Sequence, residues 1–100
     1  MTESQRAALT LAGESGLPYV GLRGLRPDPN LLLYLPAALT RTVDVVPLSL
    51  EENLLRLACA APDVDLEPIR SRFPRLALEV CLSGVDEIRA VRAGMGEVTA

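Results

Sequence analysis

Residues 76–82 constrain the fold more than any other segment, because large apolar side chains occupy every second position there. These residues are Leu76, Leu78, Val80 and Leu82, and between them stand Ala77, Glu79 and Cys81. Successive side chains of a strand point to opposite faces of its sheet, so a period of two predicts a strand with one face toward a core. The same parity places Cys81 on the outward face.

Two earlier segments alternate in the same way and predict a hairpin around a turn at residues 51–53. Val46, Leu48 and Leu50 share one side of the first strand. Leu55, Leu57 and Cys59 share one side of the second strand. After the hairpin, Asp65 predicts a helix start and Pro74 a helix end. Leu66, Ile69 and Phe73 recur between them at the helical spacing of three and four residues.

A further helix follows the strand at residues 76–82. Ser83 and Asp86 have the spacing of a helix cap, and the inward residues would be Val85, Ile88 and Val91. Residues 43–95 therefore predict a β-β-α-β-α unit with a three-stranded sheet, followed by a flexible tail at residues 96–100. If the last strand runs parallel to residues 54–60, the helix between them makes a right-handed crossover, but the sequence does not fix the strand order.

Residues 1–42 are expected to be mainly helical. Thr2 and Gln5 have the spacing of a capping box and predict a helix over residues 3–13. Pro18 favours an extended arm over residues 17–22. Asp28-Pro29 begins a helical turn through residues 31–35, and the helical pattern resumes over residues 37–41 after Pro36. Residues 1–100 are thus predicted to form one α/β (α+β) domain, a small two-layer sandwich of helices on a sheet.

The composition excludes several kinds of chemistry. The chain has no histidine and no lysine, so Cys–His catalysis, a mixed metal site and a lysine-containing phosphate loop cannot be built. We therefore expect a chain that is not an enzyme, with no catalytic, metal-binding or cofactor-binding residue. A net charge of −3 disfavours binding to nucleic acid or to an anionic membrane.

The expected location is the cytoplasm. The N-terminus lacks the pattern of a secretion signal, and no stretch has the eighteen or so apolar residues that span a bilayer. Disulfides are rare in the cytoplasm, and the strand parities place the two cysteines on opposite sides, so we expect Cys59 and Cys81 to be free, packed thiols.

A series of short motifs resembles one known domain. In chain order they are Gly16-Leu17-Pro18-Tyr19-Val20-Gly21-Leu22, Asp28-Pro29 before a leucine run, Leu35-Pro36, Val45-Val46-Pro47-Leu48, Leu55-Arg56-Leu57-Ala58-Cys59-Ala60-Ala61-Pro62 and Val85-Asp86-Glu87-Ile88. Their order over about residues 5–93 is similar to that of the N-terminal, or MshEN, domain of type II secretion and type IV pilus assembly ATPases, the general secretory pathway protein E family.

The resemblance implies a non-catalytic module that binds a protein. The partner would be the cytoplasmic domain of an inner-membrane secretion or pilus component, or a neighbouring ATPase domain, and it would hold the module at the inner face of the bacterial membrane. The alternatives are a free-standing relative of unknown pathway and a cyclic di-GMP sensor, with Arg6, Arg23, Arg26 or Arg41 on the phosphates. In the family, cyclic di-GMP sites use two segments that begin with Arg-Leu-Gly, and this sequence lacks the first segment and that start.

The arm and the leucine run at residues 30–39 are the candidate contact surface. So many consecutive apolar side chains cannot all reach the core of a small domain, and exposed apolar area is typical of an interaction site. The candidate partner-binding residues are Leu17, Pro18, Tyr19, Leu31, Leu32, Tyr34 and Leu35. The other interpretation is that the leucine run only covers an edge of the sheet.

Overall fold

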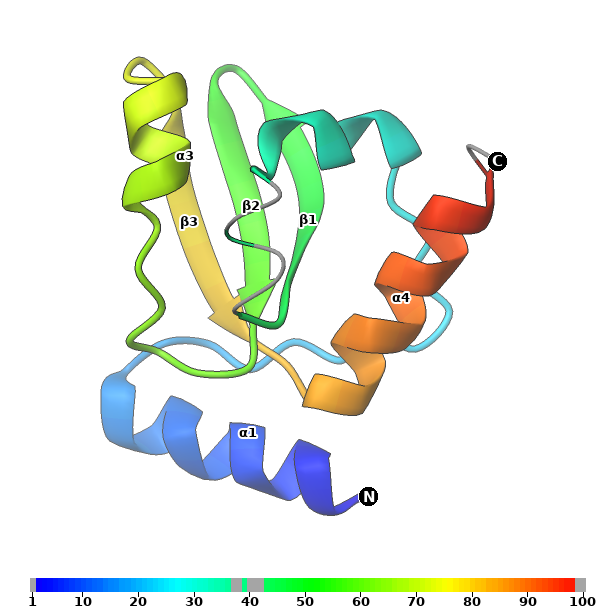
Figure 1. Ribbon diagram of the computed structural model, residues 1–100. Coiled ribbons are helices and arrows are strands. Elements are labelled where there is room, and N and C mark those ends of the chain that lie inside the picture. Colours follow the sequence, from blue (N-terminus) through cyan, green and yellow to red (C-terminus); the bar gives the residue numbers. More distant parts are fainter. Residues whose placement is uncertain (1, 37–38, 40–42, 99–100) are drawn as a thin grey trace.

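The computed structural model describes residues 2–36, 39 and 43–98, and it shows helices packed around a three-stranded mixed sheet (Figure 1). The predicted α+β class is confirmed. In chain order the elements are α1 (Glu3–Ser15), the 3-10 helix η1 (Pro29–Tyr34), β1 (Val45–Glu51), β2 (Leu54–Cys59), α3 (Glu67–Arg72), β3 (Ala77–Leu82) and α4 (Val85–Val98).

The sheet has β2 at its centre. β1 and β2 form the predicted antiparallel hairpin, and its turn places Glu52 and Asn53 at positive φ angles of 49° and 67°. β2 and β3 run parallel, with α3 in the connection between them. Parallel neighbours require such a crossover, and this pairing fixes the strand order that the sequence leaves open.

Apolar side chains are buried on both faces of the sheet. On one face, Leu55 and Leu57 of β2 pack in a cluster with Ile69 of α3. On the other face, Ala58 of β2 packs in a second cluster with Ile88 of α4. The helices α3 and α4 therefore cover opposite faces of the sheet, and β2 is buried from both directions.

Cys81 corrects one sequence prediction. Alternation placed it outward, and it does point away from the face that carries Cys59, but the second cluster covers it to 8% exposure. Both cysteines are free and buried. Burial, followed by the charge of the neighbouring thiol, raises the pKa of Cys59 to about 12, and burial also raises the pKa of Cys81.

The N-terminal elements follow the predictions closely. Thr2 and Gln5 form the expected capping box at the start of α1, which lies across the end of the sheet where β3 finishes (Figure 1). The Asp28 carboxylate accepts the Asn30 N–H at 2.9 Å and caps η1. The expected helical segment at residues 37–41 falls largely outside the described residues.

The C-terminal predictions require two corrections. Ser83 does not cap α4, because its hydroxyl donates instead to the Val20 carbonyl oxygen at 2.6 Å. The backbone of α4 continues through Val98, so the first residues of the expected flexible tail are helical, and the last two residues of the chain lie outside the described part. Ile88 is fully buried as predicted, and Val85 and Val91 are half-buried.

Candidate functional site

The arm at residues 17–22 is held against the end of β3. Tyr19 pairs with Leu82 in a parallel bridge. The Val20 N–H donates to the Leu82 carbonyl oxygen at 2.8 Å, and the Leu82 N–H donates to the Pro18 carbonyl oxygen at 2.8 Å. The predicted extended arm is therefore confirmed, and its backbone is fixed by the sheet.

Glu87, in the first turn of α4, ties the arm to that helix. Its carboxylate accepts the Leu22 N–H at 2.8 Å and the Tyr19 hydroxyl at 3.1 Å. Burial alone would raise the pKa of Glu87, but hydrogen bonds from Leu22, Gln5, Tyr19 and Gly84 together hold it below its ordinary value. This carboxylate therefore joins α1, the arm and α4 in its charged form.

The chain reverses direction directly after the arm. The Leu25 N–H donates to the Leu22 carbonyl oxygen at 3.0 Å, and Gly24 lies at a φ of 78°. A type II turn needs a positive φ at this third position, which glycine adopts without strain. The turn anchors Leu22 in the core at 1% exposure and leaves Leu25 42% exposed between Arg23 and Arg26.

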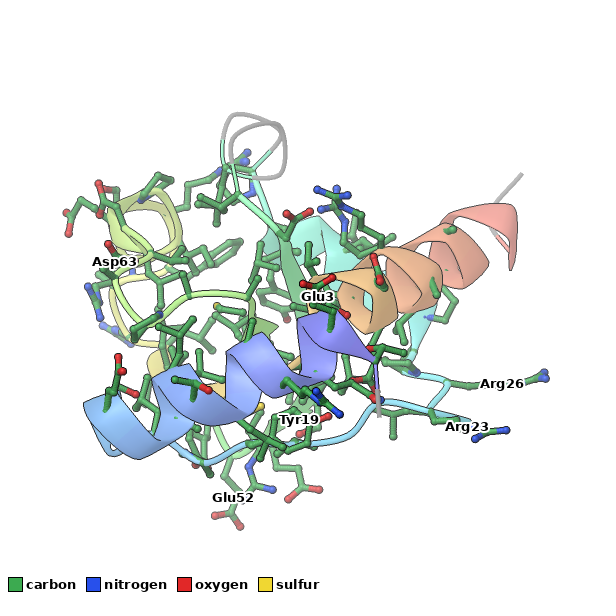
Figure 2. The ribbon with its side chains drawn as sticks, turned by 90° about the horizontal axis from the view of Figure 1, so that it is seen from below. Glu3, Tyr19, Arg23, Arg26, Glu52 and Asp63 are labelled. Carbon is green, nitrogen blue, oxygen red and sulfur yellow. The ribbon has the colours of Figure 1, made fainter. Side chains whose placement is uncertain are left out.

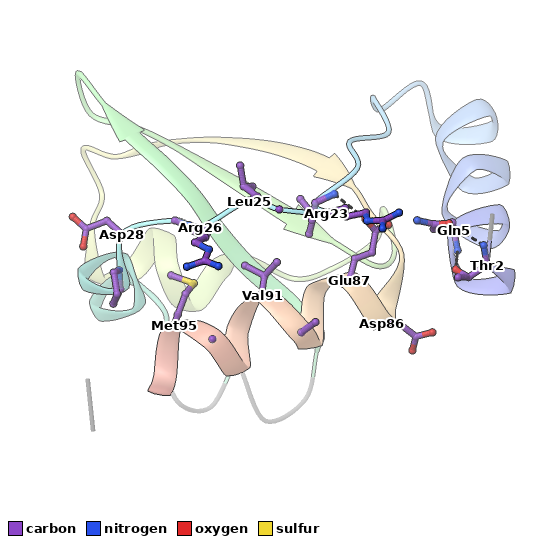
Figure 3. A pocket seen from close by; sticks show the side chains of 16 residues that line it. Thr2, Gln5, Arg23, Leu25, Arg26, Asp28, Asp86, Glu87, Val91 and Met95 are labelled. Carbon is purple, nitrogen blue, oxygen red and sulfur yellow. Dashed lines mark hydrogen bonds between the residues drawn. The ribbon is translucent and has the colours of Figure 1, made fainter. Parts of the chain in front are cut away.

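An open groove of about 1050 Å³ separates this segment from α4 (Figure 3). Residues 22–29 form one wall, and the other wall is α4, with Thr2 and Gln5 of the N-terminal segment at one end. The apolar side chains of the lining include Leu22, Leu25, Val91 and Met95. The small residues Ala90 and Gly94 also line the helical wall, and a β-carbon added at Gly94 would meet nothing within 4 Å.

Each of the three acidic residues of the groove accepts a hydrogen bond from another part of the chain or from its own turn. Asp28 caps η1, Asp86 accepts the Ser4 hydroxyl at 3.2 Å, and Glu87 holds the arm. Arg23 and Arg26 extend into solvent from their segment (Figure 2), and neither has an ion-pair partner within residues 2–36, 39 and 43–98. The hydrogen bonds to the acidic residues come from neutral donors, so the carboxylates keep their charge, and the lining carries three acidic residues against two arginines.

The predicted partner-binding residues do not line this groove. Leu31 and Leu35 are buried at 9% and 7% exposure, so they offer no surface as folded, and the prediction is corrected for these two. Pro18 is exposed, and the half-buried residues are Leu17, Tyr19, Leu32 and Tyr34. The ring of Tyr34 packs on Phe73 with centroids 5.0 Å apart, and a role in partner binding stays a prediction for these residues.

Sequence reasoning missed the groove as a binding surface. The sequence predicts Arg23 and Arg26 only as phosphate contacts, and its candidate contact residues do not include Leu33, the most exposed large apolar residue of the described chain at 76%. The segment Arg23-Gly24-Leu25-Arg26 carries a usable signal: turns lie on the surface and arginines are seldom buried, so a leucine between two arginines beside a turn glycine is expected to be exposed. The opposing wall of the groove is α4, which lies about sixty residues later in the chain.

The described part of the chain holds no group of acidic or cysteine side chains that could bind a metal ion. No helix in that part is long and apolar enough to cross a membrane. The buried thiols are poor nucleophiles, since the thiolate is the reactive form and burial raises their pKa values. Neither thiol lines the groove.

Comparisons with known proteins place the chain in a family. No curated protein is similar enough in sequence to match it. The N-terminal domain of XpsE superposes with a TM-score of 0.73 at 23% identity, covering 90% of this chain and 64% of that one, so the chain spans about two thirds of its length. The structure of MshE with cdg has a TM-score of 0.71 at 21% identity, covering 97% of this chain and 68% of that one.

The two superpositions show a shared fold, and the sequence itself supplies the family assignment. The sequence profile of the MshEN domain matches residues 15–95, from the end of α1 through most of α4, which includes the arm, the turn and both walls of the groove. The chain therefore belongs to the MshEN domain family, and its resemblance to the N-terminal domain of type II secretion and type IV pilus assembly ATPases is confirmed.

Proposed function

We propose that this chain is a non-catalytic docking module of a type II secretion or type IV pilus assembly ATPase system. It works in the cytoplasm, where its groove binds the cytoplasmic domain of an inner-membrane platform protein. The observation that carries the proposal is the open apolar groove between residues 22–29 and α4, in a chain of the MshEN family.

The groove has the features of a protein-binding surface. Leu25 is 42% exposed between two arginines without ion-pair partners in the described chain, and arginine and apolar side chains are typical of the centres of interfaces. Each carboxylate of the groove accepts a hydrogen bond from this chain. The absence of histidine removes the commonest general base.

Calorimetric titration of the platform protein's cytoplasmic domain into the pure chain tests the proposal. We expect saturable binding that Leu25→Ser weakens about tenfold, because burying the exposed part of a leucine side chain contributes roughly 1–2 kcal/mol to an interface. The matched control is Leu9→Ser, since Leu9 is 38% exposed on α1, away from the groove. No binding, or equal losses in the two variants, contradicts the proposal.

Leu33→Ser separates the groove from the leucine run. Leu33 is 76% exposed on η1 and does not line the groove, so its replacement tests the surface at residues 30–39 without disturbing residues 22–29. A loss of affinity in Leu33→Ser with none in Leu25→Ser would move the docking surface to that run.

Cyclic di-GMP sensing is the second candidate, favoured by one observation. The fold matches that of MshE, which was solved with cdg. The exposed arginines of residues 22–29 are suitable donors to phosphate oxygens. A calorimetric titration with cyclic di-GMP tests it: saturable heat abolished by Arg23→Glu would support sensing, and the absence of heat and of a thermal shift would remove it.

A further inference from the structure

We infer that the outer edge of β3 binds an extended segment of a protein partner, which adds to the sheet as a further strand beside Leu78 and Val80. No residue of β3 lines the groove, so the inference does not depend on the proposed docking function. It follows from three features: the direction of the backbone groups of β3, the point at which the arm leaves this edge, and the contrast with the opposite edge of the sheet.

The backbone groups of β3 that face away from the sheet belong to every second residue. The Ala77 N–H donates to the Asn53 carbonyl oxygen at 2.7 Å, on the side of β2. Leu82 faces the other way, because both its N–H and its carbonyl oxygen bond to the arm. In a parallel ladder successive residues of a strand alternate in this way, so the N–H and C=O groups of Leu78 and Val80 also point away from β2.

The arm cannot pair with these groups. If its parallel ladder continued from Leu82, the Val80 carbonyl oxygen would accept the N–H of residue 18, and Pro18 has none. Gly16, whose carbonyl oxygen would accept the Val80 N–H, lies at a φ of 79° at the end of α1 and is not extended. Within residues 2–36, 39 and 43–98, the outward N–H and C=O groups of Leu78 and Val80 therefore have no hydrogen-bond partner.

The opposite edge of the sheet, formed by β1, is protected against pairing. Pro47 lies in this strand and has no N–H, and the register of the β1–β2 pair shifts between Pro47 and Ser49. Prolines and bulges keep edge strands from pairing with other chains, and η1 also packs against β1. β3 has no proline, and its register is regular from Ala77 to Leu82. β3 is therefore the edge that another strand can extend (Figure 1).

The two faces of β3 define the side chains of the added strand. Leu78 and Val80 are half-buried against the cluster that contains Ile69 of α3, whereas Glu79 is exposed on the other face. Residues directly opposite each other in an antiparallel pair share a face of the sheet and pack together. The occupant is thus an extended segment with apolar, β-branched residues opposite Leu78 and Val80, and with no acidic residue opposite Glu79.

A second copy of this chain does not meet that requirement. The antiparallel register that uses all the open groups of two copies pairs Leu78 of one with Val80 of the other, and it places the two Glu79 side chains directly opposite each other. Like charges at such positions destabilise a strand pair, and Arg56, at 3.6 Å from Glu79 between half-exposed side chains, offsets only part of the repulsion. A segment of a different protein is free of this repulsion.

A designed peptide tests the inference on the wild-type chain. The probe is an acetylated, amidated peptide of nine residues, in which threonine and valine alternate around a central lysine placed opposite Glu79. In the control peptide the two valines beside the lysine are N-methylated, which removes the N–H groups that face β3. We expect the probe to bind with a dissociation constant of about 1 mM and to slow amide exchange at Leu78 and Val80 in NMR spectra, and the control to bind at least about tenfold more weakly.

A single substitution tests the same contact from the protein side. Val80→Pro removes one outward N–H and leaves the bonds to β2 intact, because proline is tolerated on an edge strand where the N–H faces solvent. We expect it to weaken probe binding about tenfold, whereas the control Val80→Thr keeps the N–H and the β-branched shape and should bind like the wild type. If Val80→Pro does not fold, the comparison of the two peptides on the wild-type chain decides alone.

Three outcomes overturn the inference. The first is equal binding of the two peptides or equal weakening by the two variants, because the backbone groups of β3 would then not hold the peptide. The second is the absence of a saturable change at the Leu78 and Val80 amides. The third is a dimer of the wild-type chain, detected by sedimentation equilibrium, in which these two amides are protected without the probe. None of these outcomes affects docking in the groove, and the loss of groove docking leaves the peptide result unchanged.

Discussion

Glu87 is the residue whose replacement should loosen the groove without removing any of its apolar lining. Its carboxylate accepts the Leu22 N–H at 2.8 Å and the Tyr19 hydroxyl at 3.1 Å, and thereby holds the arm on α4. Glu87→Gln keeps the shape of the side chain but removes its charge. A hydrogen bond to a charged group contributes about 1.5–3 kcal/mol, and a neutral one about 0.5–1.5 kcal/mol. Because Glu87 is half-buried, we expect the variant protein to lose about 1–2 kcal/mol of unfolding free energy.

Urea unfolding at pH 7 measures this loss as a lower midpoint at an unchanged slope. In a domain of this size each kcal/mol lowers the melting temperature by about 4–8 °C. Hydrogen exchange should locate the effect, because the Leu22 amide loses its charged acceptor and should exchange faster in the variant. Glu79→Gln is the control, since its 3.6 Å contact with Arg56 joins side chains that are about half exposed and contributes little.

The pH dependence provides a second check on Glu87. Its pKa is lower in the folded state than the ordinary value of 4.5, so its stabilising effect is complete above that value and is lost as the pH falls through the folded pKa. The difference between wild type and Glu87→Gln should therefore disappear in acid. A loss no larger than that of Glu79→Gln at pH 7, or one that persists unchanged at low pH, would refute the reasoning.

Three further predictions concern the fold. Glu52→Gly should raise stability by about 0.5–1 kcal/mol in urea unfolding, because glycine relieves the φ of 49°, whereas Glu51→Gly in β1 should lower it by a similar amount. Cys59 and Cys81 should resist iodoacetamide in the native protein and react once it unfolds, as mass spectrometry can follow; rapid native labelling would show that the core opens. Ile69→Ala should cost about 2–5 kcal/mol, and a smaller loss would mean that the cavity collapses.

Local periodicity was enough to predict the sheet. The alternation at residues 76–82 and in the hairpin identified all three strands, because one face of each had to meet a core. The same alternation misplaced Cys81, because its same-face neighbour Glu79 is charged and local spacing does not reveal a second cluster on that face. Ser83 was misread for a similar reason: its spacing from Asp86 is that of a cap, but the arm supplies a closer acceptor.

The leucine run shows why the surface was harder to predict than the fold. The sequence predicts that five consecutive large side chains at positions 31–35 cannot all reach one core. In the structure Leu32 and Tyr34 pack against both clusters, while Leu31 and Leu35 are buried, so only Leu33 is strongly exposed. A segment placed between two clusters can bury residues on several sides, and local spacing alone does not show this.

The groove depends on a juxtaposition that no local pattern contains. Arg23 and Arg26 lie in a segment without helical or strand period, and the opposing wall is the face of α4 that carries Ala90 and Gly94. The two walls meet because the arm pairs with β3 and Glu87 bonds its end. The composition excluded Cys–His catalysis and a lysine-containing phosphate loop, but only the three-dimensional arrangement showed which acids accept hydrogen bonds within the chain and which arginines lack an ion-pair partner in its described part.

The footprint of a bound platform domain, mapped by hydrogen–deuterium exchange, tests the central claim most directly. Docking in the groove predicts slower exchange along residues 22–29 and α4, with little change in α3 on the opposite face of the sheet. Protection confined to residues 30–36, or to no segment at all, would contradict a docking role for the groove.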